Sequence, residues 1–234
     1  GHIRGYAIEG EAAKQVTEAF AAKQESCGGF LFAVGDGNHS LATAKTCWEN
    51  IKKSGKFTEE QLKTHPARQA LVEICNLHSE ALEFKPIHRL LTNVDVKDML
   101  SFFKAEIVKQ GLESAEGDEI VFEYVESGSC DSAKPANGIN ITNRGDRLPV
   151  EILQGILDKY LEIHDNVEID YIHGDEALHG LVKETKGCGI FLQSIDKSTL
   201  FPAINAGGVL PRKTFSIGEA NEKRYYMECH KISM

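Results

Sequence analysis

Residues 30–44, which read FLFAVGDGNHSLATA, join an apolar run, a turn with two glycines and the start of a helix. Residues 30–34 show no alternation with polar residues, as is typical of a strand buried on both faces of a sheet. Gly35 and Gly37 flank Asp36 in the turn, and Ser40 is suited to cap a helix that runs to about residue 53. The stretch therefore predicts a buried strand, a tight turn and a helix.

The rest of the chain mixes helices and strands without strict alternation. The patterns predict helices over residues 9–25, 66–77, 95–110, 149–164, 176–186 and 198–206. They predict strands over residues 120–125, 139–141, 167–172, 190–193, 215–217 and 224–232, and an extended segment over 84–91. This order favours an α+β fold with mixed sheets and packed helices over a doubly wound parallel sheet.

The domain organisation is expected to be simple. Residues 1–234 are predicted to form a single compact α+β fragment, with a possible seam at the polar loop of residues 127–137. The chain begins at Gly1 without a methionine. We therefore expect a fragment of a longer protein.

Composition excludes several classes of protein. The formal net charge of -9 argues against sequence-independent nucleic-acid binding, which needs a basic surface. No apolar run approaches the roughly 18–20 residues of a membrane span, and the N-terminus has no signal-peptide pattern. The six cysteines lie at least 20 positions apart, without a CxxC pair. This spacing predicts free thiols in a reducing compartment and hence a cytoplasmic protein.

The turn at residues 35–40 combines groups that suit a phosphate ligand. A helix N-terminus offers unpaired N–H groups and the positive end of the helix dipole. Glycine lets the backbone approach a ligand closely. Asp36 adds a carboxylate that can bind Mg²⁺ or act as a base, and His39 adds a proton donor. The same residue types also favour turns and caps for structural reasons alone.

Several familiar motifs are missing. Gly35, Gly37 and Ser40 nearly match a dinucleotide-binding fingerprint, but residues 49–57 are polar and do not supply its second strand. No Walker P-loop, serine-hydrolase elbow or zinc-protease helix motif occurs.

Two further cation pairs are candidate anion ligands. His88 and Arg89 follow Pro86, and Arg212 and Lys213 follow Pro211 near a Gly-Gly turn. Either pair can hold a phosphate or carboxylate, or simply lie beside surface acids. The three histidines His164, His173 and His179 have spacings that fit no single helix turn, and are interpreted as scattered rather than as a metal site.

Three stretches carry a resemblance to a known family. Residues 35–45 resemble the Asp-Gly-His-His-Arg-Tyr box of the bacterial family called domain of unknown function 1015. Two further stretches are similar to the same family. One runs from residues 65–68 to residues 86–89, and the other runs from residues 210–216 to residues 222–226. Proteins of this family are longer, which implies that an N-terminal part is missing.

The resemblance implies a nucleotide site. The family's box is similar to one in the ParB/sulfiredoxin-like fold, which includes free serine kinases and CTP-binding ParB proteins. In those relatives the box contacts nucleotide phosphates. By this likeness Asp36 and His39 are the candidate catalytic residues, and the candidate phosphate ligands are Gly37, Asn38, Ser40, His88, Arg89, Arg212 and Lys213. Asn38 replaces the first histidine of the box, and Ser40 replaces its arginine, a bidentate phosphate ligand.

Three hypotheses follow. The first is an enzyme that uses ATP or ADP with Mg²⁺, held by Asp36, to phosphorylate a small hydroxylated metabolite such as serine. The second is a nucleotide- or metabolite-sensing module without turnover, which the missing arginine favours. The third, DNA binding by the ParB likeness, is disfavoured by the negative charge.

Overall fold

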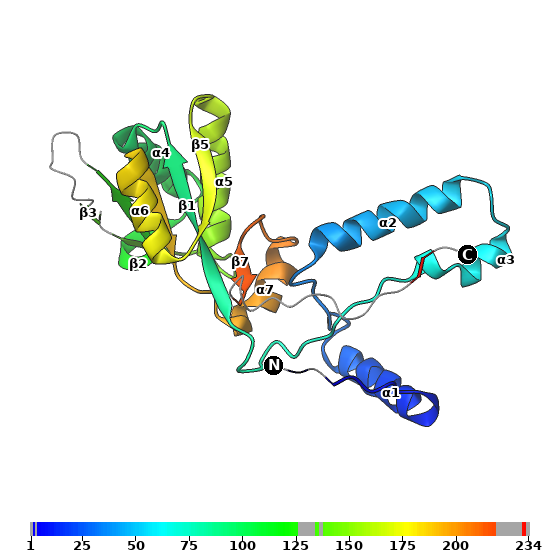
Figure 1. Ribbon diagram of the computed structural model, residues 1–234. Coiled ribbons are helices and arrows are strands. Elements are labelled where there is room, and N and C mark those ends of the chain that lie inside the picture. Colours follow the sequence, from blue (N-terminus) through cyan, green and yellow to red (C-terminus); the bar gives the residue numbers. More distant parts are fainter. Residues whose placement is uncertain (1, 3, 126–133, 136–137, 219–230, 233–234) are drawn as a thin grey trace. The chain divides into compact units, whose positions relative to one another are not determined.

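The computed structural model describes residues 2, 4–125, 134–135, 138–218 and 231–232 (Figure 1). Its contacts divide the chain into two compact units, unit 1 up to Arg68 and unit 2 from Gln69 to Ile232. The expectation of one compact fragment over residues 1–234 stays a prediction. Most of the seam expected at residues 127–137, and most of the strand expected at 224–232, lie outside the described residues.

Unit 1 is helical in its described part. Its elements are α1 (Gly10–Ser26), α2 (Asn38–Lys53), α3 (Glu59–Thr64) and the 3₁₀ turn η1 (Pro66–Arg68). Gly28 and Gly29 both have positive φ angles and lead the chain out of α1. Thr58 and Gln61 form a reciprocal capping box that starts α3, an element absent from the sequence prediction.

Little of unit 1 is buried. Helices α1, α2 and α3 have no buried residue, whereas His65 and Ala67, which follow α3, are buried. The His65 ring lies 4.8 Å from the Phe57 ring and 5.7 Å from the Trp48 ring, between centroids. The Ala67 N–H donates to His65 Nδ1 at 3.1 Å. This small aromatic cluster joins α2 to η1.

Two predicted elements of this region are wrong. Residues 30–34 form no strand, and Phe32 and Val34 are 50% and 55% exposed. No described strand pairs with this run, and a lone extended segment leaves its backbone groups to water. The helix predicted over residues 66–77 shrinks to η1, and residues 69–76 are neither helix nor strand. Leu71 and Ile74 are exposed, so no tertiary burial stabilises a helix over residues 69–76.

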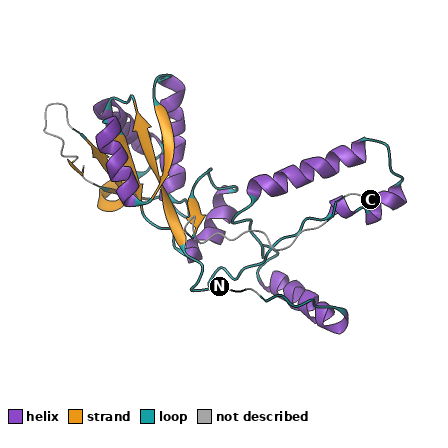
Figure 2. Cartoon of the chain, viewed as in Figure 1, coloured by secondary structure: helices purple, strands orange, loops and turns teal. Residues whose placement is uncertain are grey.

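Unit 2 is built on a sheet (Figure 2). Its seven described strands are β1 (Phe84–Thr92), β2 (Glu113–Tyr124), β3 (Lys134–Pro135), β4 (Ile139–Thr142), β5 (Glu168–His173), β6 (Cys188–Leu192) and β7 (Phe215–Ile217). The main order is β3-β2-β6-β1-β5, while β4 pairs with β2 and β7 with β1. Each described pairing is antiparallel. Strand β1 lies between two neighbours, because Arg89 lies opposite Tyr171 of β5 and Ile190 of β6.

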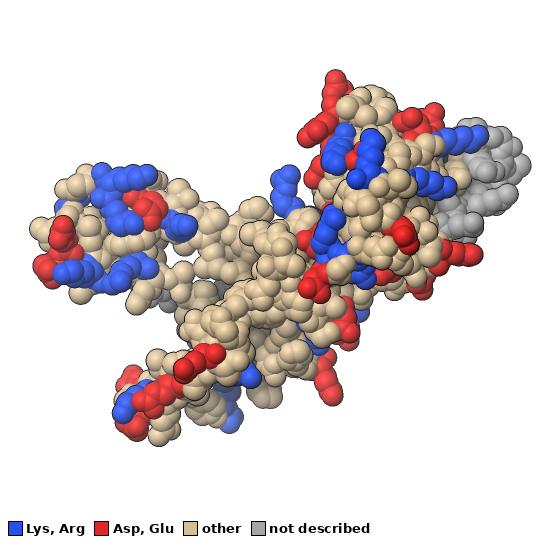
Figure 3. Space-filling view, turned by 180° about the vertical axis from the view of Figure 1, so that it is seen from behind, with Lys and Arg blue, Asp and Glu red and all other residues tan. Residues whose placement is uncertain are grey.

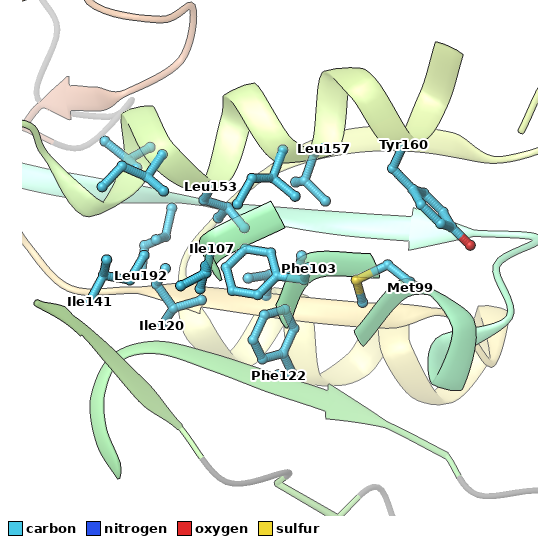
Figure 4. Packing of buried hydrophobic residues seen from close by; sticks show 14 of the residues in the cluster. Met99, Phe103, Ile107, Ile120, Phe122, Ile141, Leu153, Leu157, Tyr160 and Leu192 are labelled. Atoms are coloured by element: carbon cyan, nitrogen blue, oxygen red, sulfur yellow. The ribbon is translucent and has the colours of Figure 1, made fainter. Parts of the chain in front are cut away.

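Helices α4 (Val96–Lys109) and α5 (Pro149–Ile163) cover one face of the sheet and enclose the main core (Figure 4). Asp95 caps α4 by accepting the N–H groups of Lys97 and Asp98, and a proline opens α5. Within the core, the Phe103 and Phe122 rings meet edge to face at 5.4 Å. Burial of these aromatic and aliphatic side chains is the main stabilising contribution to unit 2.

Helix α6 (Asp175–Thr185) covers the opposite face. Successive strand residues point to opposite faces. Leu90 therefore packs with Leu178 and Val182 of α6, whereas the next residue, Leu91, belongs to the main core. Gly189 lies beneath this helix, and a Cβ placed there would lie 2.6 Å from Val182 Cγ2. Helix α7 (Lys197–Gly207), capped by Asp196, follows β6.

The predicted α+β class is confirmed. No helix in the described ranges is both long and apolar enough to cross a bilayer. Acidic and basic side chains are interspersed on the face seen in Figure 3, where the described residues present no continuous basic surface.

Candidate functional site

The turn before α2 is formed by Asp36 and Gly37. Gly37 has a φ of 78° and is the N-cap of the helix, a left-handed conformation that glycine adopts at little cost. The Gly37 N–H donates to Asp36 Oδ1 at 2.8 Å, and the Gly37 carbonyl accepts the N–H of Leu41 at 2.9 Å. The prediction that Ser40 caps this helix is wrong, because the helix already begins at Asn38 and places Ser40 in its first turn.

The start of α2 differs from the other described α-helices. It has neither a side-chain cap nor an acidic residue in its first turn. Each of the others has one or both, and the residues concerned are Glu11, Thr58, Glu59, Glu60, Asp95, Asp98, Glu151, Asp175, Glu176 and Asp196. The positive end of α2 therefore has no acidic residue within the helix, and the carboxylate of Asp36 lies in the turn before it.

The five predicted residues of the turn lie together at the surface. Asp36, Asn38, His39 and Ser40 are exposed, and Gly37 is half-buried. The turn thus presents a carboxylate, an imidazole, an amide and a hydroxyl around the first N–H groups of the helix. It can bind an anion from solvent without rearrangement of a core.

His88 is buried in unit 2 on the face covered by α6. Its Nδ1 accepts the Leu192 N–H at 3.1 Å, so Nε2 carries the proton and donates to Asp175 Oδ1 at 2.8 Å. Burial lowers the pKa of His88 below its usual value, although the hydrogen bond to Asp175 opposes this effect. Both ring nitrogens are already engaged, which leaves no donor for a phosphate.

Arg89 is fully buried on the opposite face, beneath α5. Its Nε donates to Gln154 Oε1 at 2.9 Å, its Nη1 donates to the Ile87 carbonyl, and its guanidinium lies 4.7 Å from the Tyr171 ring centroid. Burial lowers the pKa of Arg89 to about 10. Within the described structure its Nη2 is buried without a hydrogen-bond partner.

This geometry corrects one interpretation of the sequence. His88 and Arg89 were expected to act as a pair on one anion, but consecutive residues of a strand point to opposite faces. Their exposures are 1% and 0%, so neither reaches solvent. A separate role for either residue in phosphate binding stays a prediction.

The second predicted pair lies in the loop between α7 and β7. Arg212 and Lys213 are exposed, and Lys213 has a φ of 59°. The Thr214 hydroxyl donates to the Pro211 carbonyl at 2.6 Å and closes the turn around the two cations. The loop can meet an anion from solvent, and it belongs to unit 2 whereas Asp36 belongs to unit 1.

The sequence prediction missed a group of polar residues around α6. Asp175 contacts His88, and His179 Nδ1 lies 2.7 Å from Oε2 of the buried Glu123. The rings of His88 and His179 both lie against Phe191, at 5.3 and 4.6 Å. Asp175 and His179 are four residues apart and share a helix face. That spacing was visible in the sequence, but their partners on β1 and β2 were not.

Comparison with known proteins gives a family. No curated protein matches the chain. Among solved structures it is similar to a conserved hypothetical protein from Pyrococcus furiosus, with 16% identity and a TM-score of 0.43 over 63% of this chain and 61% of that one. It is also similar to free serine kinase in complex with AMP, with 16% identity and a TM-score of 0.44 over 62% and 58% of the two chains. A mutant of the kinase in complex with AMP matches over 76% of this chain and 80% of that one, again with 16% identity and a TM-score of 0.44.

The chain thus spans less than two thirds of the first two of these structures. The family model described as "Protein of unknown function (DUF1015)" matches residues 1–148, which is more than half of the sequence. The chain therefore belongs to the DUF1015 family.

Proposed function

We propose that this protein binds the phosphates of a nucleotide at the start of α2 and transfers a phosphoryl group to a small hydroxylated metabolite in the cytoplasm. One observation carries the proposal: α2 alone among the described α-helices starts without a side-chain cap or a first-turn acid. The likeness of residues 35–45 to the Asp-Gly-His-His-Arg-Tyr box supports it.

The backbone supplies the phosphate contacts. The first N–H groups of a helix have no partner within the helix and point along its axis. At α2 these groups belong to Asn38, His39 and Ser40. The positive φ of Gly37 turns the chain away without a side chain over the helix end, so that a phosphate oxygen can approach the N–H groups.

Asp36 supplies the metal contact or the base. Mg²⁺ in phosphoryl-transfer sites is usually held by one or two carboxylates and by the substrate phosphates, with water completing the shell. One exposed carboxylate beside a phosphate site fits that donor set. When bound, ATP with Mg²⁺ would supply the phosphoryl group and part of the charge neutralisation. Asp36 would hold the metal or accept the proton of the attacking hydroxyl.

Each unit has exposed groups that can donate to an anion. His39 is exposed in the first turn of α2 and can donate a hydrogen bond to a phosphate oxygen. Arg212 and Lys213 are exposed on a short loop of unit 2. These two cations form a separate candidate contact for an anion within unit 2.

A second candidate function is a nucleotide- or metabolite-sensing module without turnover. Ser40 occupies the place of the arginine in the box, and a hydroxyl cannot supply the bidentate contact of a guanidinium. Phosphates would then be bound more weakly and with less neutralisation of charge in a transition state.

Binding is tested first. A thermal-shift screen with ATP, ADP and AMP, with and without Mg²⁺, should raise the unfolding midpoint for at least one nucleotide. A ligand that binds only the folded state at 100 times its Kd stabilises it by about 2.7 kcal/mol. Calorimetry then gives the affinity, and the absence of binding for every nucleotide contradicts the proposal.

Turnover separates the two candidates. Release of phosphate and formation of a phosphorylated product are measured with serine and other small hydroxylated acceptors. Asp36→Asn keeps an oxygen acceptor for the Gly37 N–H but removes the negative charge. An enzyme should lose turnover in this variant at an unchanged unfolding midpoint. A sensing module binds the nucleotide in calorimetry and shows no turnover in either form.

A further inference from the structure

The described histidines that contact a carboxylate do so in two ways. His88 and His164 contact Asp175 and Asp98 through Nε2, at 2.8 and 3.4 Å, and these acid side chains are 71% and 54% exposed. His179 contacts Glu123 through Nδ1 at 2.7 Å, and the Glu123 side chain is only 7% exposed. Among these three, only His179 contacts its acid through Nδ1, which leaves Nε2 on the other side of the ring from the acid.

The contact with Glu123 sets the tautomer of His179. An ionised carboxylate only accepts hydrogen bonds, so the proton of His179 lies on Nδ1 and the lone pair lies on Nε2. Glu123 Oε1 is buried without a hydrogen-bond partner in the described structure. Burying a carboxylate costs free energy unless a hydrogen bond or an opposite charge compensates it. For Glu123, the contact with His179 supplies that compensation. A positive charge that develops on this imidazole would be stabilised in turn.

The side chain of His179 is partly open to solvent. The His179 side chain is 48% exposed, and its ring is steadied by Phe191 at 4.6 Å between centroids. Lys183 lies one helix turn further along the same face of α6. A hollow of about 310 Å³, lined by Val125, Lys183, Glu184 and Lys186, begins there. The hollow carries two ammonium groups and one carboxylate, and Lys183 joins it to the helix face that holds His179.

We propose that His179 accepts a phosphoryl group at Nε2, with Glu123 as its positioning residue. The Nε2 lone pair attacks phosphorus and an N–P bond forms. The donor is a phosphoramidate: its P–N bond breaks, and the electron pair departs with the nitrogen, which takes a proton from water. The Nδ1 proton stays between the imidazole and Glu123, whose charge balances the imidazolium. Lys183 faces the charge of the phosphoryl group.

Phosphoramidate tests this step, because it phosphorylates imidazoles and does not need a nucleotide site. The full chain is incubated with it, and the sites and rates of addition are followed by mass spectrometry under alkaline conditions. Addition at His179 should exceed addition at every other histidine. It should disappear in His179→Asn and slow by about tenfold to a hundredfold in Glu123→Gln, since a lost orienting carboxylate has effects of that size. His164→Asn is the matched control and should leave the rate at His179 unchanged.

Folding is checked by the unfolding midpoint of each variant. If Glu123→Gln unfolds, the ¹⁵N chemical shifts of the wild-type imidazole decide the point: a protonated Nδ1 and an unprotonated Nε2 at mildly alkaline pH support the proposal, and the opposite tautomer overturns it. Equal labelling of all exposed histidines, no labelling of His179, or a rate in folded Glu123→Gln equal to that of the wild type would also overturn it. If phosphorylation of His179 fails, the proposed nucleotide site at the start of α2 is not affected, because the phosphoramidate test involves no nucleotide.

Discussion

His88 and Arg89 are consecutive residues of β1, and their side chains are buried on opposite faces of the sheet. His88 links β1 to α6 through Asp175, whereas Arg89 links β1 to α5 through Gln154. The strand therefore carries a polar contact to a helix on each side. This arrangement makes both residues important for the stability of unit 2, and the first two predictions concern them.

Arg89→Ala should lower the free energy of unfolding by about 2–4 kcal/mol, because it removes a large buried side chain and leaves Gln154 without its donor. Urea denaturation followed by circular dichroism measures the change. Arg212→Ala, at an exposed arginine, is the control and should stay within about 0.5 kcal/mol of the wild type. Equal effects of the two substitutions would show that Arg89 is not buried as described.

The contribution of His88 to stability should depend on pH. Burial holds the pKa of His88 in the folded state below the value of about 6.5 in an unfolded chain. Folding therefore favours the neutral imidazole, and the stabilisation is fully present above about pH 6.5. It is lost as the pH falls through the folded pKa, with a slope of at most about 1.4 kcal/mol per pH unit.

The reference for this measurement is His88→Phe, which cannot titrate. The difference in unfolding free energy between wild type and variant should decrease steadily from about pH 7 to pH 5. A difference that does not change over this range would contradict the buried, neutral imidazole.

Gly189 should not tolerate a side chain. Its added Cβ would lie 2.6 Å from Val182 Cγ2, and Leu178 leaves little room for adjustment. Gly189→Ala should therefore cost about 1–3 kcal/mol. Gly155, within α5, has no atom within 4 Å of such a Cβ, and Gly155→Ala should stabilise by about 0.5–1 kcal/mol. The two alanines should shift the urea midpoint in opposite directions.

Hydrogen exchange should differ between the elements of the two units. Helix α1 has no buried residue, whereas β6 and the adjoining part of β1 are mostly buried. Amides protected only by local structure exchange quickly, and those in a core exchange through larger openings. We expect rapid exchange in α1 and slow exchange in β1 and β6. Comparable protection in α1 and β6 would contradict the burial described for unit 1.

The sequence predicted elements best where local signals and tertiary packing agree. Helices α4, α5 and α6 were predicted to within about two residues, because their caps, opening proline and apolar stripes coincide with faces that the sheet buries. The prediction failed for residues 30–34 and 69–77. Their apolar residues indicate burial, yet most of them stay exposed, and periodicity alone does not reveal a partner.

The candidate site was predicted in part. Residues 36–40 could be found from the glycines and the helix start, because that arrangement is local. The pairing of His88 and Arg89 was wrong because adjacency in a strand separates side chains rather than joining them. Glu123 and His179 are 56 positions apart in the sequence, and only the order of β2, β6 and α6 brings them together.

The most direct test of the account is a nuclear magnetic resonance titration of the ¹⁵N-labelled chain with ATP and Mg²⁺. The account predicts that the backbone amide signals of Asn38, His39 and Ser40 shift most, in a saturable manner, and that Asp36→Asn weakens the response to Mg²⁺. If the nucleotide binds and these three signals stay in place, or if no signal moves at millimolar ATP, the proposed phosphate site at the start of α2 is contradicted.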